Sequence, residues 1–136
     1  MILTTNFTLK EFTDSETAAK KKINNTPTEE HVANLKALCE KVLQPVRDIL
    51  KKPIKINSGF RSKDLNEAIK GAASSQHMYG EAADITLGSK NSNKGLFKTI
   101  KDLGVYDQLI DEQDYNWIHV SYKRIGVNRK QILHLK

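Results

Sequence analysis

The feature that most constrains the fold is a regular run of aliphatic residues in the first half of the chain. They recur at intervals of three or four positions: Val32, Leu35, Leu38, Val42, Val46 and Ile49. This spacing places them on one face of an α-helix, so it predicts an amphipathic helix with one buried face. The segment Thr26-Pro27-Thr28-Glu29-Glu30 supplies a start signal. Pro45 is expected to end or kink the helix nearby.

Shorter patterns predict the remaining elements. A capping box at Thr8 predicts a first short helix, and further helices are expected over 15–22, 62–70 and 96–103. Loops are expected over 72–80 and 87–94. Strands are expected over 53–57, 81–86, 106–110, 117–122 and 131–135, the last as an edge strand. Because helices come first and strands mostly later, the predicted class is α+β, a small and mostly antiparallel central sheet with helices packed on it.

Length and cysteine content limit the organisation of the chain. Its 136 residues, 38% of them hydrophobic, predict one domain over residues 1–136 with a self-standing core. Cys39 is the single cysteine, so an intrachain disulfide and a multi-cysteine zinc site are both excluded. We expect Cys39 to pack as a small hydrophobic residue beside the long helix. Any metal must therefore be held mainly by His, Asp and Glu.

The net charge of +6 favours acidic partners or simple solubility. The basic residues are scattered and no aromatic stacking array accompanies them, so no nucleic-acid partner is expected. The sequence has no run of about 18 apolar residues, so no membrane span is expected. The N-terminus lacks a basic segment and a long apolar core, which predicts synthesis in the cytoplasm without a signal peptide.

Two of the four histidines stand in unusual settings. His31 and His134 are expected to be solvated. His77 lies in a loop seven residues before Asp84, which is predicted on a strand that alternates with small and aliphatic residues. A carboxylate in such a strand is costly unless it is paired or bound to a cation. His119 shares a strand face with polar and aromatic neighbours, which is typical of a cleft.

Together, His77, Asp84 and His119 would supply two nitrogens and one oxygen to a metal with one open position. This ligand pattern is typical of catalytic rather than structural zinc. A buried His–Asp hydrogen bond would explain the same residues without a metal. The spacing alone leaves both interpretations open.

The sequence around these residues resembles that of a known family. Ser75-x-His77-x-x-Gly80-x-Ala82-x-Asp84 resembles the zinc motif of the D-Ala-D-Ala carboxypeptidase and dipeptidase family of metallopeptidases, which includes phage L-alanyl-D-glutamate endopeptidases of endolysin type. Further segments resemble the family in the same order: 7–12, 43–47, 56–62, 107–112, 117–121 and 128–129. The resemblance covers nearly the whole chain, is closest to the short carboxypeptidase-type branch, and implies a Hedgehog/DD-peptidase-like fold.

The resemblance also implies residue roles. His77, Asp84 and His119 match the ligands of Zn²⁺. Arg61 matches the arginine that binds the substrate carboxylate, and Ser75 matches a serine that orients the ligand loop or the substrate.

The general base departs from the family pattern. Many members carry an acid three residues before the last histidine ligand, where this chain has Asn116. We therefore predict Glu112 as the base, because a hairpin would bring it alongside the segment 117–119, with Asp114 as the alternative. The acidic turn 111–114 also fits an ordinary solvated hairpin.

The function implied by the resemblance is zinc-dependent hydrolysis of peptidoglycan stem peptides by a monomer acting at the cell wall after release. The positive charge would then assist binding to an anionic wall. The alternative is a non-catalytic zinc-binding protein of the same fold that binds the cell wall or serves as a phage structural component. The bond cleaved, the export route and a phage or bacterial origin stay open.

Overall fold

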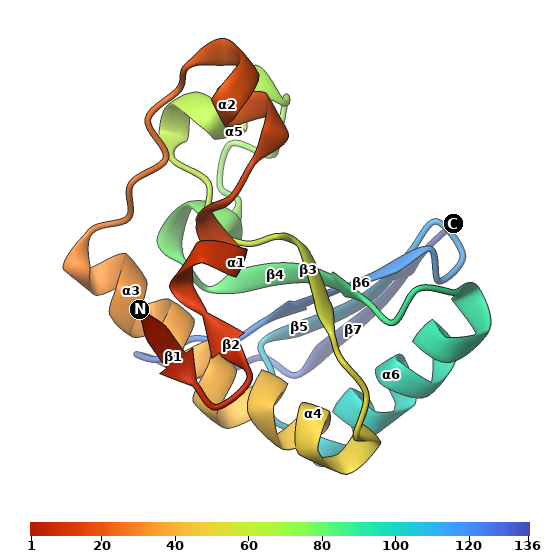
Figure 1. Ribbon diagram of the computed structural model, residues 1–136. Coiled ribbons are helices and arrows are strands. Elements are labelled where there is room, and N and C mark those ends of the chain that lie inside the picture. Colours follow the sequence, from red (N-terminus) through yellow and green to blue (C-terminus); the bar gives the residue numbers. More distant parts are fainter.

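A five-stranded sheet lies at the centre of the computed structural model, which describes residues 1–136 (Figure 1). Its strand order is β3-β4-β6-β5-β7. The strands are β3 (Lys55–Ser58), β4 (Ala82–Thr86), β6 (Trp117–Ser121), β5 (Gln108–Glu112) and β7 (Gln131–Leu135). Every neighbouring pair is antiparallel except β5 and β7, which run parallel. The predicted α+β class with a mostly antiparallel sheet is confirmed.

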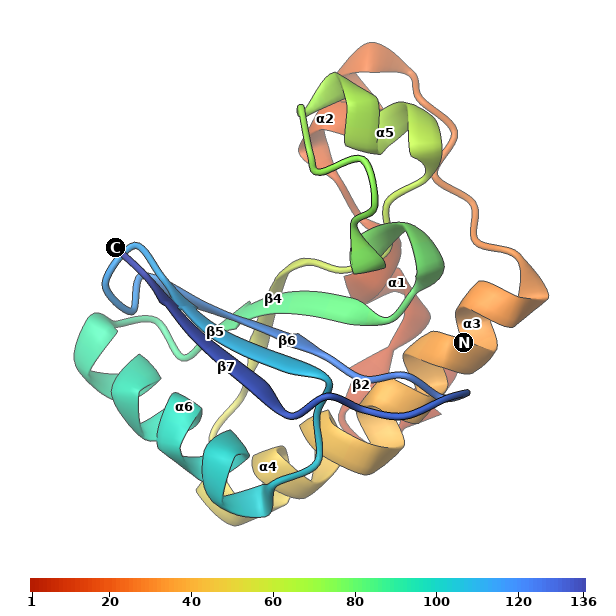
Figure 2. The same cartoon turned by 180° about the vertical axis from the view of Figure 1, so that it is seen from behind.

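One face of the sheet is covered by helices. These are α3 (Glu29–Leu38), the π-helical turn η1 (Cys39–Leu43), α4 (Gln44–Leu50) and α6 (Lys90–Leu103). Both views show α4 and α6 on the same side of the sheet (Figures 1 and 2). Ala83 and Ile85 of β4 and Ile118 and Val120 of β6 point into this core. The alternate residues Asp84 and His119 therefore face the other side of the sheet.

The long amphipathic helix runs through Pro45 without ending there. The residues before the proline form a π turn, in which the backbone N–H of Gln44 bonds to the carbonyl of Cys39. A proline lacks the N–H that a regular helix would use, and here it stands at the start of α4. The expected break thus becomes a local change of hydrogen bonding. Ile49 is 59% exposed, so the buried stripe ends at Val46.

Several predicted elements differ from the structure, and strand β3 begins at Lys55 rather than at residue 53. Helix α6 begins at Lys90, so most of the predicted loop 87–94 is helical; Ser89 caps it by accepting a hydrogen bond from the N–H of Ser92. Strand β5 lies two residues later than predicted, and the turn that follows it covers residues 113–116. The loop 72–80 contains the 3₁₀ turn η2 (Gln76–Tyr79).

Smaller elements complete the chain. A two-stranded sheet, β1 (Ile2–Thr4) with β2 (Phe7–Thr8), was not predicted. Helix α1 (Leu9–Thr13) follows with its capping box, in which Glu11 accepts a hydrogen bond from the N–H of Thr8 at 2.7 Å. Helices α2 (Glu16–Lys21) and α5 (Lys63–Ala68) lie side by side beyond the open face of the sheet (Figures 1 and 2). None of the helices combines the length and the apolar character needed to span a membrane.

Candidate metal centre

The structure brings His77, Asp84 and His119 together on the open face of the sheet. Asp84 and His119 stand directly opposite each other on β4 and β6. His119 Nδ1 lies 2.9 Å from Asp84 Oδ1, and His77 Nε2 lies 3.4 Å from the same oxygen. One ligand atom from each residue falls within 4.8 Å of the other two. Three residues far apart in sequence thus form one cluster of two imidazoles and a carboxylate.

His77 reaches the cluster from η2, and the local sequence sets its orientation. Ser75 precedes the turn, and its hydroxyl accepts the backbone N–H of His77 at 3.2 Å. His77 Nδ1 lies 2.7 Å from the carbonyl oxygen of Gly59, which can only accept, so Nδ1 carries the proton. Nε2, which faces Asp84, is then left with a lone pair in the neutral ring.

Gly80 ends this turn because no other residue fits there. Its φ is +73°, in the left-handed region. A Cβ atom at this position would lie 2.6 Å from the carbonyl oxygen of His31. The glycine of the sequence motif is therefore required by backbone packing close to His77.

The electrostatics of the cluster favour an ionised carboxylate. Burial raises the pKa of Asp84, but its contacts with the rings of His119 and His77 outweigh burial and hold this pKa below its usual range. Arg61 Nη2 adds a positive charge 3.5 Å from Asp84 Oδ2. A charged carboxylate with two neutral imidazoles is a donor set that fits Zn²⁺ and leaves one position open.

Arg61 lies between the cluster and the end of β3. Its Nε donates to the hydroxyl of Ser58 at 3.2 Å, and its Nη1 lies 3.4 Å from Asn66 Oδ1. Its backbone N–H bonds to the carbonyl of His77, which ties the two segments together. Burial lowers the pKa of Arg61, while Asp84 and Glu112 oppose that effect. A guanidinium still carries its charge at neutral pH under these conditions.

The acidic hairpin residues have different surroundings. Glu112 is the last residue of β5 and pairs with Trp117, which places it on the same face as His119. The indole N–H of Trp117 donates to Glu112 Oε2 at 3.2 Å. Asp111 points to the opposite face and contacts His134. Asp114 is exposed in the turn, and Asn116 is exposed just before β6.

The predictions that His31 and His134 are solvated have different outcomes. His31 is not freely solvated: its Nδ1 accepts the backbone N–H of Thr28 at 3.1 Å, and its ring lies against Phe60 with centroids 4.7 Å apart. The side chain of His134 is 61% exposed, as expected.

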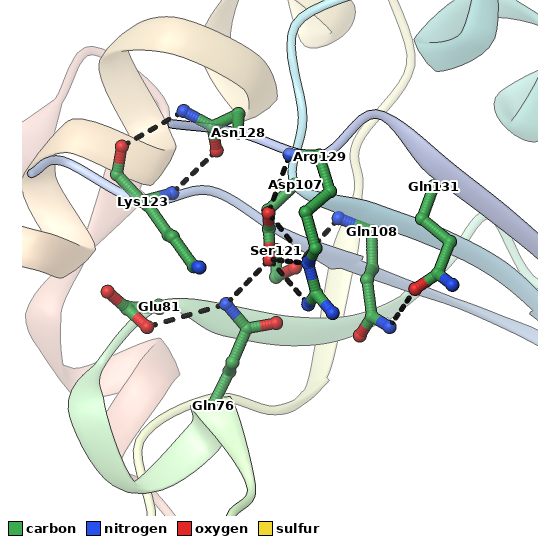
Figure 3. Close-up of polar contacts among 9 residues, drawn as sticks. All are labelled: Gln76, Glu81, Asp107, Gln108, Ser121, Lys123, Asn128, Arg129 and Gln131. Atoms are coloured by element: carbon green, nitrogen blue, oxygen red, sulfur yellow. Dashed lines mark hydrogen bonds and ion pairs between the residues drawn. The ribbon is translucent and has the colours of Figure 1, made fainter. Parts of the chain in front are cut away.

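A buried polar network beside the cluster had no predicted role. Asp107 is fully buried and accepts hydrogen bonds from Arg129 Nη2 at 2.7 Å and Gln76 Nε2 at 3.1 Å (Figure 3). Gln76 belongs to the turn that carries His77. A fully buried aspartate needs partners. Its partners Gln76 and Arg129 lie 31 and 22 residues away in sequence, so no local pattern could identify them.

Two comparisons with known proteins bear on this site. The family model described as Peptidase M15 matches residues 5–121. A curated relative, the zinc D-Ala-D-Ala carboxypeptidase of Streptomyces albus G, is 54% identical over 39 residues, which are 29% of this chain and 15% of the relative. The matched segment thus spans a small part of that protein's length. The family, the relative's zinc and the donor set agree on Zn²⁺ as the cofactor. The chain belongs to the Peptidase M15 family.

Proposed function

We propose that this chain is a single-domain zinc peptidase that hydrolyses peptidoglycan stem peptides, as a D-Ala-D-Ala carboxypeptidase or a related endopeptidase. The observation that carries the proposal is the cluster of His77, Asp84 and His119 with Arg61 beside it. The similarity of one segment to a zinc D-Ala-D-Ala carboxypeptidase supports the choice of substrate.

In this proposal, His77, Asp84 and His119 hold the metal. Bound Zn²⁺ supplies Lewis-acid polarisation of a peptide carbonyl and makes water nucleophilic near neutral pH. The protein keeps its three ligand side chains in place beforehand. Gly59 fixes the ring of His77, and the strand pairing of β4 with β6 fixes Asp84 opposite His119. Such support around metal ligands is typically worth a factor of 10–100 in metal affinity or activity.

Arg61 binds the terminal carboxylate of the peptide. Its guanidinium is a planar, permanently charged fork that matches a carboxylate in two parallel hydrogen bonds. Ser58 and Asn66 restrain this side chain on the face that carries the metal ligands. Anchoring the end of the peptide here would place the bond to be cut over the metal ligands.

Glu112 acts as the general base. It lies on the same sheet face as His119, and Trp117 holds one of its carboxylate oxygens. Glu112 accepts a proton from the attacking water and passes it to the leaving amine. Asn116 cannot do this, because an amide does not titrate in the relevant range. Ser75 orients the ligand loop through the N–H of His77.

Incubation with purified muropeptides followed by mass analysis tests this function. The zinc-loaded protein should release D-alanine or cleave the stem peptide, and a chelator should abolish the cleavage. Glu112→Gln should retain zinc and lose turnover by a factor of about 10²–10⁴. Asp114→Asn serves as the matched control and should keep full turnover. Zinc binding without any cleavage would instead favour the non-catalytic cell-wall-binding or phage structural protein.

A further inference from the structure

A polar cleft of about 320 Å³ adjoins the metal cluster. His119 forms part of its wall, so the cleft opens onto the proposed metal site. Ala72 is the one hydrophobic residue among those that line it: Ala72, Ser74, Ser75, Gln76, Gln108, His119 and Arg129. A cleft with this lining is suited to polar groups rather than to an apolar side chain.

The order of the strands separates this cleft from Arg61. Arg61 follows β3 at one edge of the sheet, and Arg129 precedes β7 at the other edge. Asp84 on β4 and His119 on β6 lie between them. A peptide held by Arg61 at one end would therefore cross the metal ligands and reach the cleft with a more distant part.

Arg129 is held in place and still has hydrogen-bond donors that are unused. Its Nε and Nη2 bond to Asp107 at 3.1 and 2.7 Å, and its backbone N–H bonds to the same carboxylate (Figure 3). Its Nη1 has no hydrogen-bond partner in the chain, and 49% of the side chain is exposed. A guanidinium that is already oriented loses little entropy when it binds a ligand.

Gln76 adds an unsatisfied acceptor to the cleft wall. Its Nε2 donates to Asp107, but its buried Oε1 has no hydrogen-bond partner. Figure 3 shows this oxygen on the side of Gln108, away from Glu81. A buried acceptor without a partner is costly, so a ligand N–H at this point would be favourable. The cleft thus offers a charged donor and an acceptor close together, which suits a peptide group next to an acidic side chain.

We propose that this cleft is a second peptide-binding subsite, in which Arg129 recognises a carboxylate on the substrate at a distance from its C-terminus, and Gln108, whose Nε2 bonds to Gln131 Oε1 at 2.6 Å, forms part of the wall. The inference rests on the proposed function. The Arg61 guanidinium lies beside Asp84 on β4, and the Arg129 guanidinium lies beside Asp107, the residue before β5. The two steps between these strands cover roughly 10 Å, or about three extended residues. The favoured substrate is therefore a peptide with an acidic residue about three positions before its C-terminal carboxylate.

Two synthetic peptides that differ only in Glu or Gln at that position test the subsite. We measure kcat/KM with the zinc-loaded chain and Kd by calorimetry with the full chain in chelator, where turnover is stopped. The wild type should prefer the Glu peptide by about tenfold in both measurements, the value of one charge-assisted hydrogen bond.

Both cleft variants leave Asp107 its hydrogen bonds from Gln76 Nε2 and from the backbone N–H of residue 129. Gln108→Glu places a negative charge in the cleft and should abolish or reverse the preference. Its control, Asn91→Asp, makes the same change in net charge at an exposed position of α6, on the helix-covered side of the sheet, and should keep the preference. Arg129→Lys loses the planar fork and should lower the preference several-fold, whereas Arg124→Lys should not. Thermal unfolding verifies that each variant folds.

The two readouts separate this inference from the proposed function. If neither peptide is cleaved but the wild type binds the Glu peptide more tightly, the subsite stands and the peptidase proposal is in error. If cleavage occurs with equal kcat/KM and equal Kd for both peptides, the subsite is refuted and the peptidase proposal stands. An unchanged preference in Gln108→Glu would also refute it.

Discussion

Gly80 offers a sharp test of how the ligand loop is held, because Gly104 provides a nearly identical backbone for comparison. Gly80 ends η2 with φ +73°, and Gly104 ends α6 with φ +72°. A Cβ at Gly80 would lie 2.6 Å from the carbonyl oxygen of His31, whereas at Gly104 it would meet nothing within 4 Å. The pair therefore separates the cost of the left-handed conformation from the cost of the contact.

Gly104→Ala should lower the free energy of unfolding by about 1 kcal/mol, the cost of a Cβ in the left-handed region. Gly80→Ala should incur that cost and about 1–3 kcal/mol more, because two backbone segments must separate to make room. Since His77 lies in the turn that would move, Gly80→Ala should also weaken zinc binding by about tenfold or more. Gly104→Ala should leave zinc binding unchanged.

Urea unfolding of the metal-free chain measures the first effect, and competition with a fluorescent zinc chelator measures the second. Equal destabilisation by the two substitutions would refute the assigned contact. Normal zinc affinity in a destabilised Gly80→Ala variant would refute the link between the turn and the metal site.

Three further predictions concern buried residues. Burial raises the pKa of Cys39, with Glu11 and Glu40 adding to the effect, so the thiol should resist alkylation at pH 8 until the chain is unfolded; rapid labelling of the native protein would contradict this. Burial raises the pKa of Asp107, but its bonds to Arg129 outweigh burial and lower it, so its contribution to stability is present above about pH 4 and is lost as the pH falls further. Urea unfolding at pH 5 and pH 3 should therefore show a smaller loss in Asp107→Asn than in the wild type, and equal losses would overturn the assignment. Leu35→Ala, at a position with no exposure, should lower the free energy of unfolding by about 2–5 kcal/mol, and a loss below 1 kcal/mol would show that the long helix is not anchored there.

The local patterns of the sequence predicted most of the fold. Alternation along 82–85 and 117–121 separated the core residues from Asp84 and His119, because neighbours on a strand must face opposite sides. The resemblance to the family implied that these two residues share one metal site, but their direct pairing across β4 and β6 was not predicted, since spacing alone does not set which strands are neighbours. Lys90–Lys94 was missed because polar residues hid a helix start that depends on the cap at Ser89.

What the sequence could not predict depends on contacts between distant segments. The network of Gln76, Asp107 and Arg129 joins three such segments, and none of these residues has a local signal for its partner. The packing of His31 on Phe60 likewise joins segments that are distant in sequence. The π turn before Pro45 is different, because it is a local change of hydrogen bonding in place of the expected break.

The metal content of the purified protein tests the proposed zinc site most directly. We expect about one zinc per chain for a site of this kind, and loss of that zinc in His77→Ala. His31→Ala is the matched control and should retain the metal, because His31 lies outside the cluster. Full zinc content in His77→Ala would contradict the assignment of His77, Asp84 and His119 as the metal site.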